Sequence, residues 1–220
     1  MIKIAPSIAS ANQSNLSRAV ELAEAGGADL LHFDLEDGVF IPNLTFGPGT
    51  IRDLRPLSQL PFDVHLEVNQ PESYFEAVVR AGADVVTVQF ESTRFPYRAL
   101  AMLKGMGVRA GLAFNAASSV EGILPVLDDL DVVHLMTAEP DGAGAAFIPG
   151  MEKKIERTAE LCGSLPIEIE VDGGINADNI SLAARAGATI FVVGRGIWSS
   201  DDVAGTIARL REAAQTGTAD

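Results

Sequence analysis

The 220-residue sequence contains very little cysteine and few basic residues. Its one cysteine, Cys162, has no partner for a disulfide within the chain, so we expect it to be a small residue of the core. A chain without disulfides is typical of a reducing compartment, and a cytoplasmic location is therefore expected. The 16 Lys and Arg residues are scattered and are outnumbered by 30 Asp and Glu. Binding to nucleic acid, which needs a basic stripe, is therefore not expected.

Long apolar runs and several catalytic motifs are also missing. No run of 18 or more apolar residues occurs, so no transmembrane helix is predicted, and the opening "MIKIAPSIAS" resembles a strand rather than a signal peptide. The sequence has neither a Gly-x-Ser-x-Gly turn nor a Walker A loop. The lysines lie at the chain start or in predicted helices, at Lys3, Lys104, Lys153 and Lys154. None of them ends a predicted strand, which disfavours a Schiff-base aldolase.

What the chain does have is a regular alternation of two patterns. Short runs rich in β-branched residues predict strands at about 2–8, 29–35, 62–68, 84–90, 108–114, 131–137, 167–172 and 189–194. Helical patterns lie near 15–25, 49–55, 72–81, 96–106, 119–128, 150–162, 177–186 and 202–213. Eight such units in 220 residues predict a single (β/α)₈ barrel, a TIM barrel, over residues 1–220. An open doubly wound sheet normally has a Gly-rich turn after its first strand, and "APSIASANQ" has none.

Polar residues gather where several predicted strands end, and that edge of a barrel carries the active site. The alternation of side chains places His32 and Asp34 on one face of the second strand. His65 lies near the end of the third strand, and Asp172 ends the seventh. Two imidazoles and two carboxylates form a ligand set suited to Zn²⁺, Mn²⁺ or Fe²⁺. The pattern alone leaves open that they are four unrelated polar residues.

Other polar residues in these strands are assigned different roles. Glu36 and Glu67 continue the same faces of the second and third strands. Asp37, together with Gly38, is expected to start a turn. His134 lies in the middle of its predicted strand, so we interpret it as an interior histidine with hydrogen-bond partners.

Three Gly-rich loops follow neighbouring predicted strands. They read "EPDGAGAAF" after the sixth, "DGGINADN" after the seventh and "GRGIWSS" after the eighth. Barrels of this kind often bind phosphate with the loops after their last two strands, where backbone N–H groups face the ligand. Glycine also serves as an ordinary turn residue, but three adjacent loops together predict a phosphate site.

In the order of its motifs the sequence resembles the ribulose-phosphate 3-epimerases. "IAPSIASA" is similar to the opening strand of that family, and "LHFDLEDGVFIPNLTFGP" to its most specific motif. "FDVHLEV", "GLAFNAAS", "VVHLMTAEP" and "EVDGGIN" follow in the family's order, so the likeness covers nearly the whole chain. It implies a barrel that epimerises a sugar phosphate, D-ribulose 5-phosphate to D-xylulose 5-phosphate by default, and that assembles as a homo-oligomer.

The resemblance also implies roles for single residues. The family's metal ligands match His32, Asp34, His65 and Asp172, and its acid–base pair matches the two aspartates. One divalent ion, zinc first and manganese or iron as alternatives, would stabilise the enediolate that forms when the carbon beside the ketone loses its proton. No organic cofactor is implied. The residues assigned to the substrate site on this basis are Ser7, His65, Met136, Gly142, Gly144, Asp172, Gly173, Gly174 and Gly194. Arg195, which has no counterpart in the family, is added to them as a candidate partner of the phosphate.

Several positions in the site depart from the family's pattern. Glu36 and Glu67 stand where the family usually has methionine, Gln89 where it commonly has histidine, and Arg195 where it has serine. The loop "DGAGA" replaces a Gly-Phe-Gly-Gly-Gln motif, and Ala116 replaces a proline. Two extra carboxylates make the pocket more anionic, and Arg195 is expected to pair either with a phosphate of the substrate or with one of those carboxylates.

Other functions stay open beside this one. The departures are explained either by drift in a divergent homologue or by a different substrate, such as a hexulose phosphate, for which Glu36, Glu67 and Gln89 would set the specificity. A barrel that binds metal without catalysis is a further alternative, although it would have no reason to keep all four metal-site residues. A decarboxylase or aldol-type synthase is disfavoured because the Asp-x-Lys-x-x-Asp motif of such barrels is missing.

Overall fold

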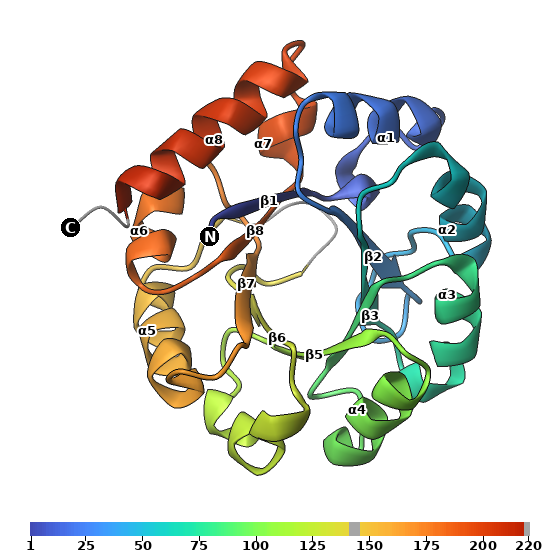
Figure 1. The fold of residues 1–220 in the computed structure, drawn as a ribbon, viewed down its shortest axis with the longest axis vertical. Helices are drawn as coiled ribbons and strands as arrows, with labels where there is room; N and C mark the ends of the chain where they lie inside the picture. Colours follow the sequence, from blue (N-terminus) through green and yellow to red (C-terminus); the bar gives the residue numbers. More distant parts are fainter. Residues whose placement is uncertain (141–145, 218–220) are drawn as a thin grey trace.

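Parallel strands form a ring at the centre of the molecule, and helices surround it (Figure 1). The computed structural model describes residues 1–140 and 146–217. Within them the strands are β1 (Lys3–Pro6), β2 (Leu31–Glu36), β3 (Phe62–Glu67), β4 (Val85–Gln89), β5 (Arg109–Phe114), β6 (Val132–Met136), β7 (Glu168–Asp172) and β8 (Ile190–Val193). Strands β2 to β8 pair in chain order, and β8 also pairs with β1. An isolated parallel bridge between Ser7 and His32 joins β1 to β2, so the predicted (β/α)₈ barrel is confirmed.

The helices between the strands follow the predicted pattern with two differences. The α-helices are α1 (Leu16–Ala25), α2 (Pro48–Leu54), α3 (Phe75–Ala81), α4 (Pro96–Gly105), α5 (Met151–Cys162), α6 (Ile180–Arg185), α7 (Arg195–Trp198) and α8 (Val203–Gly217). Short 3₁₀ helices are η1 (Ile8–Ser10), η2 (Arg55–Leu57), η3 (Pro71–Ser73) and η4 (Val120–Asp129). The sequence patterns do not predict α7. The α-helix expected at 119–128 is wrong in type: it is the 3₁₀ helix η4, because Pro125 inside it has no N–H to donate and its ring clashes with the preceding turn.

The main apolar core lies between the ring and the helices. Leu31, Phe33 and Leu35 alternate along β2, and each is at most 3% exposed. They belong to one cluster that includes Val20 of α1 and Ile207 of α8. Full burial of a large apolar side chain contributes about 1.5–3 kcal/mol. This layer therefore stabilises the barrel and leaves the inner faces of the strands to other residues.

The inner face of the ring is unusually polar. A small separate apolar cluster consists of Ala5, Leu30, Ile190 and Val192. Seven polar residues of the strands are at most 1% exposed, namely His32, Asp63, His65, Thr87, Gln89, His134 and Glu170. Burying polar groups costs free energy unless they are paired, so this arrangement points to a function for the interior of the barrel.

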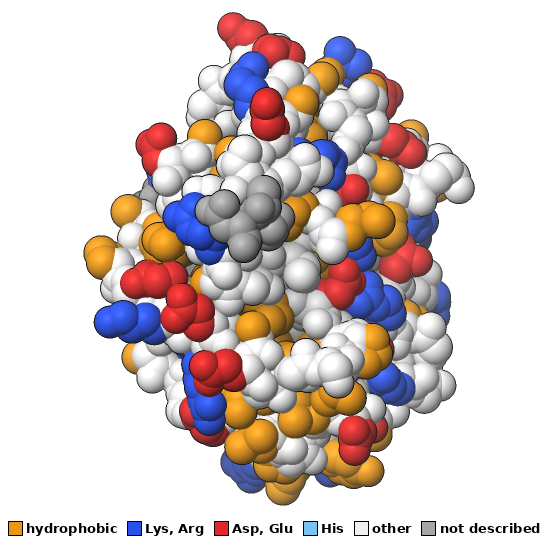
Figure 2. All heavy atoms as spheres, turned by 60° about the vertical axis from the view of Figure 1, so that its left-hand side comes forward, with side chains coloured by type: hydrophobic (Ala, Val, Ile, Leu, Met, Phe, Trp, Pro, Cys, Tyr) orange, Lys and Arg blue, Asp and Glu red, His pale blue; other side chains and the backbone are white. Residues whose placement is uncertain are grey.

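Surface charge does not gather by sign on the face shown in Figure 2, where acidic, basic and apolar side chains are interspersed. Cys162 is 4% exposed within the core cluster, as predicted. Among the helices of residues 1–140 and 146–217, none has the length and apolar character needed to cross a membrane.

Lys154 of α5 fastens the loop that follows β5. Its Nζ donates hydrogen bonds to the carbonyl oxygens of Asn115 (2.5 Å), Ala116 (3.3 Å) and Ser118 (2.8 Å). Burial lowers the pKa of this ammonium group to about 8. The lysine thus supplies the hydrogen-bond donor for three backbone carbonyl groups of a loop at the C-terminal edge of the barrel.

Lys154→Met is expected to lower the free energy of unfolding by about 1–2 kcal/mol, because three carbonyl groups lose their donor. The loss should grow as the pH rises from about 8 towards 10.5. In that range the unfolded chain keeps a proton that the folded lysine has released, so the wild-type protein gains stability that the variant cannot gain. Urea denaturation at both ends of the range measures the difference. Lys153→Met, at the exposed neighbouring position, is the matched control, and equal losses in the two variants would contradict the role of Lys154.

Candidate active site

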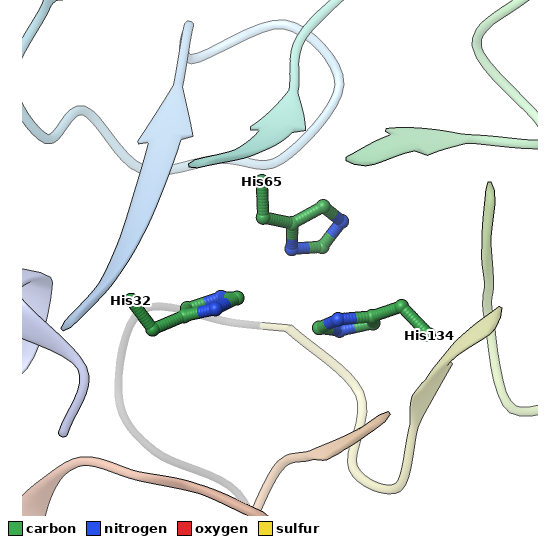
Figure 3. Close-up of side chains that lie close together, drawn as sticks. All are labelled: His32, His65 and His134. Carbon is green, nitrogen blue, oxygen red and sulfur yellow. The ribbon is translucent and has the colours of Figure 1, made fainter. Parts of the chain in front are cut away.

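Three histidines meet inside the barrel, below its C-terminal edge (Figure 3). The ring centroids of His65 and His134 are 4.3 Å apart, and those of His32 and His134 are 5.6 Å apart. His134 Nδ1 lies 2.5 Å from Glu170 Oε1, and His32 Nδ1 lies 2.8 Å from Asp63 Oδ2. The prediction that His134 is an interior histidine with hydrogen-bond partners is therefore confirmed.

The sequence patterns above do not single out Asp63 and Glu170. Asp63 lies two positions before His65, and Glu170 lies two positions before Asp172, so each shares the inner face of its strand with a predicted site residue. Each also faces, in the register of the sheet, the histidine that it contacts. The period of two along β3 and β7 is the signal that would have identified them.

The four residues predicted to hold a metal come together above these histidine–carboxylate pairs. Asp34 Oδ1 lies 2.9 Å from His32 Nε2 and 3.4 Å from His65 Nδ1. Asp172 Oδ2, which comes from β7, lies 3.9 Å from His32 Nε2. One ligand atom from each of the four lies within 4.8 Å of the others. Two imidazole nitrogens and two carboxylate oxygens suit a divalent transition metal.

The surroundings of His65 also fit a metal. Its Nδ1 is buried and has no hydrogen-bond partner among the described residues, and the same holds for Oε1 of Gln89. Gln89 Nε2 lies 3.1 Å from His65 Nε2. If the Gln89 amide is turned by half a turn, its oxygen accepts a hydrogen bond from His65 Nε2–H, and Nδ1 keeps its lone pair for a metal. The residues present therefore fit a divalent ion.

Burial and neighbouring charges shift the pKa values of the two aspartates in opposite directions. Burial alone would raise the pKa of Asp34, but the adjacent His32 outweighs it and holds that pKa well below its usual range. Burial, together with the negative charge of Asp34, raises the pKa of Asp172 to about 7. Two carboxyl groups whose pKa values are driven apart in this way are suited to act as base and acid.

A cavity of about 460 Å³ opens above these four residues at the C-terminal edge of the strands. The predicted substrate-site residues that line it are Ser7, Met136, Asp172, Gly173, Gly174, Gly194 and Arg195. His65 and Gln89 are fully buried and are not part of the lining. Gly142 and Gly144 lie outside the described residues. The cavity thus joins most of the predicted substrate site to the predicted metal site.

Among the residues that the structure describes, two other groups of side chains have atoms close enough to share an ion. They are His32 with His65 and His134, and His32 with Asp63 and Glu170. All five residues are at most 1% exposed, and none of them lines the cavity. The group that includes Asp34 and Asp172 is the better candidate because both aspartates reach the cavity.

Close backbone packing shapes the wall of the cavity formed by the loops after β7 and β8. Gly173 has a φ of 115°, and a Cβ at this position would lie 2.5 Å from the backbone nitrogen of Ala138. Trp198 of α7 donates a hydrogen bond from Nε1 to the carbonyl oxygen of Ser7 at 2.7 Å. The unpredicted helix α7 therefore ties the loop after β8 to the end of β1, where Ser7 Oγ donates to Asp34 Oδ2 at 2.8 Å.

The opposite wall of the cavity carries the two glutamates that stand in methionine positions. Glu36 and Glu67 are register partners at the ends of β2 and β3. Asn43 Nδ2 donates a hydrogen bond to Glu36 Oε2 at 2.5 Å. Thr45 Oγ1 accepts from the Glu36 backbone N–H and donates to the carbonyl oxygen of Asp34. Burial, followed by the charges of Asp34 and Glu36, raises the pKa of Glu67 well above its usual value.

Asp37 and Gly38 form the turn predicted after β2. Asp37 Oδ1 accepts hydrogen bonds from the backbone N–H groups of Val39 (2.8 Å) and Phe40 (2.9 Å), and Oδ2 accepts one from Asn69 (2.7 Å). Gly38 has a φ of 73°, a conformation that favours glycine. The turn interpretation of Asp37 is confirmed.

Comparison with known proteins agrees with the motifs. The model of the "Ribulose-phosphate 3 epimerase family" matches residues 3–198. The ribulose-phosphate 3-epimerase of Bacillus subtilis is 39% identical over 214 residues, which are 96% of this chain and 99% of that protein. Ribulose-phosphate 3-epimerase 1 of Cupriavidus necator is 40% identical over 223 residues, covering 97% of this chain and 92% of that protein.

A solved structure supports the fold. The crystal structure of 3-keto-L-gulonate-6-phosphate decarboxylase from Vibrio cholerae aligns with a TM-score of 0.74 over 98% of each chain, at 16% sequence identity. At that identity the likeness concerns the barrel alone. The matches in sequence decide the family: the chain belongs to the ribulose-phosphate 3 epimerase family and is an isomerase that acts on carbohydrates.

Proposed function

We propose that the protein is a metal-dependent 3-epimerase of a ketose phosphate, with D-ribulose 5-phosphate and D-xylulose 5-phosphate as its substrate pair. The observation that carries the proposal is the meeting of Asp34 and Asp172 with His32 and His65 at the base of the cavity. In a chain of this family, that meeting supports a reaction in which two carboxylates move a proton beside a bound divalent ion. The tail of the substrate then occupies the cavity above them.

His32, Asp34, His65 and Asp172 would hold the metal, with zinc as the first choice and manganese or iron as alternatives. When bound, the ion supplies Lewis-acid stabilisation of the negative charge that develops on the substrate oxygens. No organic cofactor is needed for this chemistry, because the proton removed is already acidified by the neighbouring ketone.

The two aspartates move the proton. Asp34 lies on β2 and Asp172 on β7, and β1 and β8 separate these strands in the ring. A substrate between them therefore presents opposite faces of its C3 to the two carboxyl groups. One aspartate removes the C3 proton to give the enediolate, and the other returns a proton to the opposite face, which inverts the centre. Ser7 Oγ, which donates to Asp34, orients that carboxylate.

The phosphate would bind against the wall formed by the loops after β7 and β8. Gly174 and Gly194 border the cavity there, and Arg195 also lines it. Backbone N–H groups in glycine-rich turns bind phosphate oxygens well, and a guanidinium group adds charge-assisted hydrogen bonds. This assignment puts the phosphate across the cavity from Glu67, since β3 lies four strands from β7 and three from β8 in the ring.

Proton exchange with solvent tests the proposal directly. In D₂O we expect D-ribulose 5-phosphate to yield D-xylulose 5-phosphate with deuterium at C3, while the recovered substrate keeps its protium at early times, because different carboxyl groups handle the two protons. NMR of both epimers measures this, on a panel with hexulose phosphates and unphosphorylated pentuloses and with metal content recorded. Equal rates on the phosphorylated and unphosphorylated sugars would contradict the phosphate assignment. A preference for a hexulose phosphate would make that sugar, rather than D-ribulose 5-phosphate, the proposed substrate. If no ketose exchanged its C3 proton, the epimerase proposal would be refuted, and the remaining interpretation would be a barrel that binds metal without catalysing a reaction.

A further inference from the structure

The mechanism proposed above gives no task to the carboxyl groups of Glu36 and Glu67, which line the cavity on β2 and β3. Glu36 and Glu67 are the last residues of β2 and β3, are register partners and both line the cavity. Glu67 is 2% exposed, and its Oε1 is buried without a hydrogen-bond partner in the described part of the chain. Glu36 accepts a hydrogen bond from Asn43 and also interacts with the side chain of Glu67.

A buried carboxyl oxygen without a partner costs free energy that the fold alone does not require. The net penalty for leaving such a group unsatisfied is about 1–3 kcal/mol. A methionine or leucine at the end of β3 would fill the same place without that cost. Because Glu67 also lines the cavity, its carboxyl group is the candidate for contact with a ligand there.

The position of Glu67 in the ring indicates which end of a ligand it meets. In the ring order, β3 lies four strands from β7 and three from β8, so Glu67 stands across the cavity from the loops assigned to phosphate, while Glu36 on β2 lies two strands from β8. Two neighbouring carboxyl groups would repel a phosphate and disfavour an apolar group. A hydroxyl group suits them, because it donates to a carboxylate and accepts from a carboxylic acid.

We propose that Glu67, supported by Glu36, binds the C1 hydroxyl at the unphosphorylated end of the ketose phosphate and makes the site selective for ketoses that carry it. This inference rests on the proposed function for the orientation of the substrate. In a 2-ketose whose C3 is epimerised, the phosphate-bearing chain leaves C3 on one side and the C1 hydroxymethyl group leaves the ketone on the other. With phosphate at β7 and β8, the hydroxymethyl group points to β2 and β3.

A ligand pair that differs only in this hydroxyl tests the inference. Calorimetric titration compares D-xylulose 5-phosphate with 1-deoxy-D-xylulose 5-phosphate, which has a methyl group in place of the C1 hydroxymethyl group. Epimerisation during the titration does not affect the comparison, because D-ribulose 5-phosphate carries the same C1 hydroxyl. We expect the wild-type protein with its metal to prefer the hydroxylated ligand by about tenfold or more, because the deoxy ligand leaves Glu67 unpaired. Glu67→Met should reduce the preference to less than about threefold. Glu67→Gln, which keeps hydrogen-bonding atoms at this position, should retain most of it.

Controls separate specificity from folding and from the reaction. Glu156→Met on the exposed side of α5 makes the same chemical change away from the cavity and should keep the full preference. If Glu67→Met does not fold, as judged by circular dichroism, Glu36→Met provides the second variant, with an expected loss of about threefold in preference.

Several outcomes would overturn the inference. They are equal affinity of the wild-type protein for the two ligands, an unchanged preference in Glu67→Met or in the Glu36→Met variant that replaces it, and no binding of either ligand. The last result would also remove the proposed function. A preference that depends on Glu67, combined with no deuterium exchange at C3, would instead leave the binding site in place and refute the epimerase reaction alone.

Discussion

Replacing Asp172 with Asn is expected to lower the rate of epimerisation by about 1,000-fold while leaving the barrel folded. Asp172 ends β7 and faces the cavity, and burial together with the charge of Asp34 raises its pKa to about 7. An amide in its place neither accepts nor returns a proton, and the loss of a positioned acid–base group costs about 10²–10⁴-fold in rate. Single-turnover assays in both directions, with metal content determined in parallel, measure the effect.

The form of the defect separates proton transfer from a structural role. Asp34 remains in this variant, so the C3 proton that faces Asp34 should still exchange with D₂O. We therefore expect exchange from one 3-epimer and much slower exchange from the other. Asp178→Asn makes the same change at an exposed position of the same loop and should keep the wild-type rate. An Asp172→Asn variant that retained most of its activity would contradict the two-carboxylate mechanism.

Replacing His65 with Ala is expected to abolish metal binding and activity together. His65 Nδ1 is buried, lies 3.4 Å from Asp34 Oδ1 and has no hydrogen-bond partner among residues 1–140 and 146–217. Loss of a residue that only supports a ligand costs about 10–100-fold in metal affinity, so loss of a ligand should cost at least about 100-fold. Competition with a chelator, followed by metal analysis of the desalted protein, measures the affinity.

His134 provides the matched control for this experiment. It is the same residue type, equally buried, and its ring lies 4.3 Å from that of His65. His134→Ala therefore removes the same atoms and should destabilise the barrel to a similar degree, but should retain metal with much higher affinity than His65→Ala. Equal loss of metal in the two variants would show that packing, rather than ligation, explains the effect.

Local patterns in the sequence were sufficient to predict the barrel. Runs rich in β-branched residues marked the strands, and side-chain alternation along β2 separated its apolar outer face from His32 and Asp34 on the inner face. Their positions near strand ends brought His65 and Asp172 into the predicted metal set. Alternation was not applied to Asp63 and Glu170, although it places them on the same inner faces as these two residues. The error at η4 came from Pro125, whose effect on the backbone outweighs the helical spacing of the apolar residues around it.

The sequence by itself determined which groups are present at the C-terminal edge of the barrel: the ligand set, the acid–base candidates, the glycine loops and the unusual glutamates. Only the tertiary structure decided how these groups share the interior. It placed Gln89 behind His65 rather than in the cavity, tied α7 to Ser7, and left one oxygen of Glu67 unpaired beside Glu36. Hydrogen bonding and burial between strands far apart in the chain depend on the register and closure of the ring. The register and closure are set by the packing of the whole barrel, which no local sequence pattern encodes.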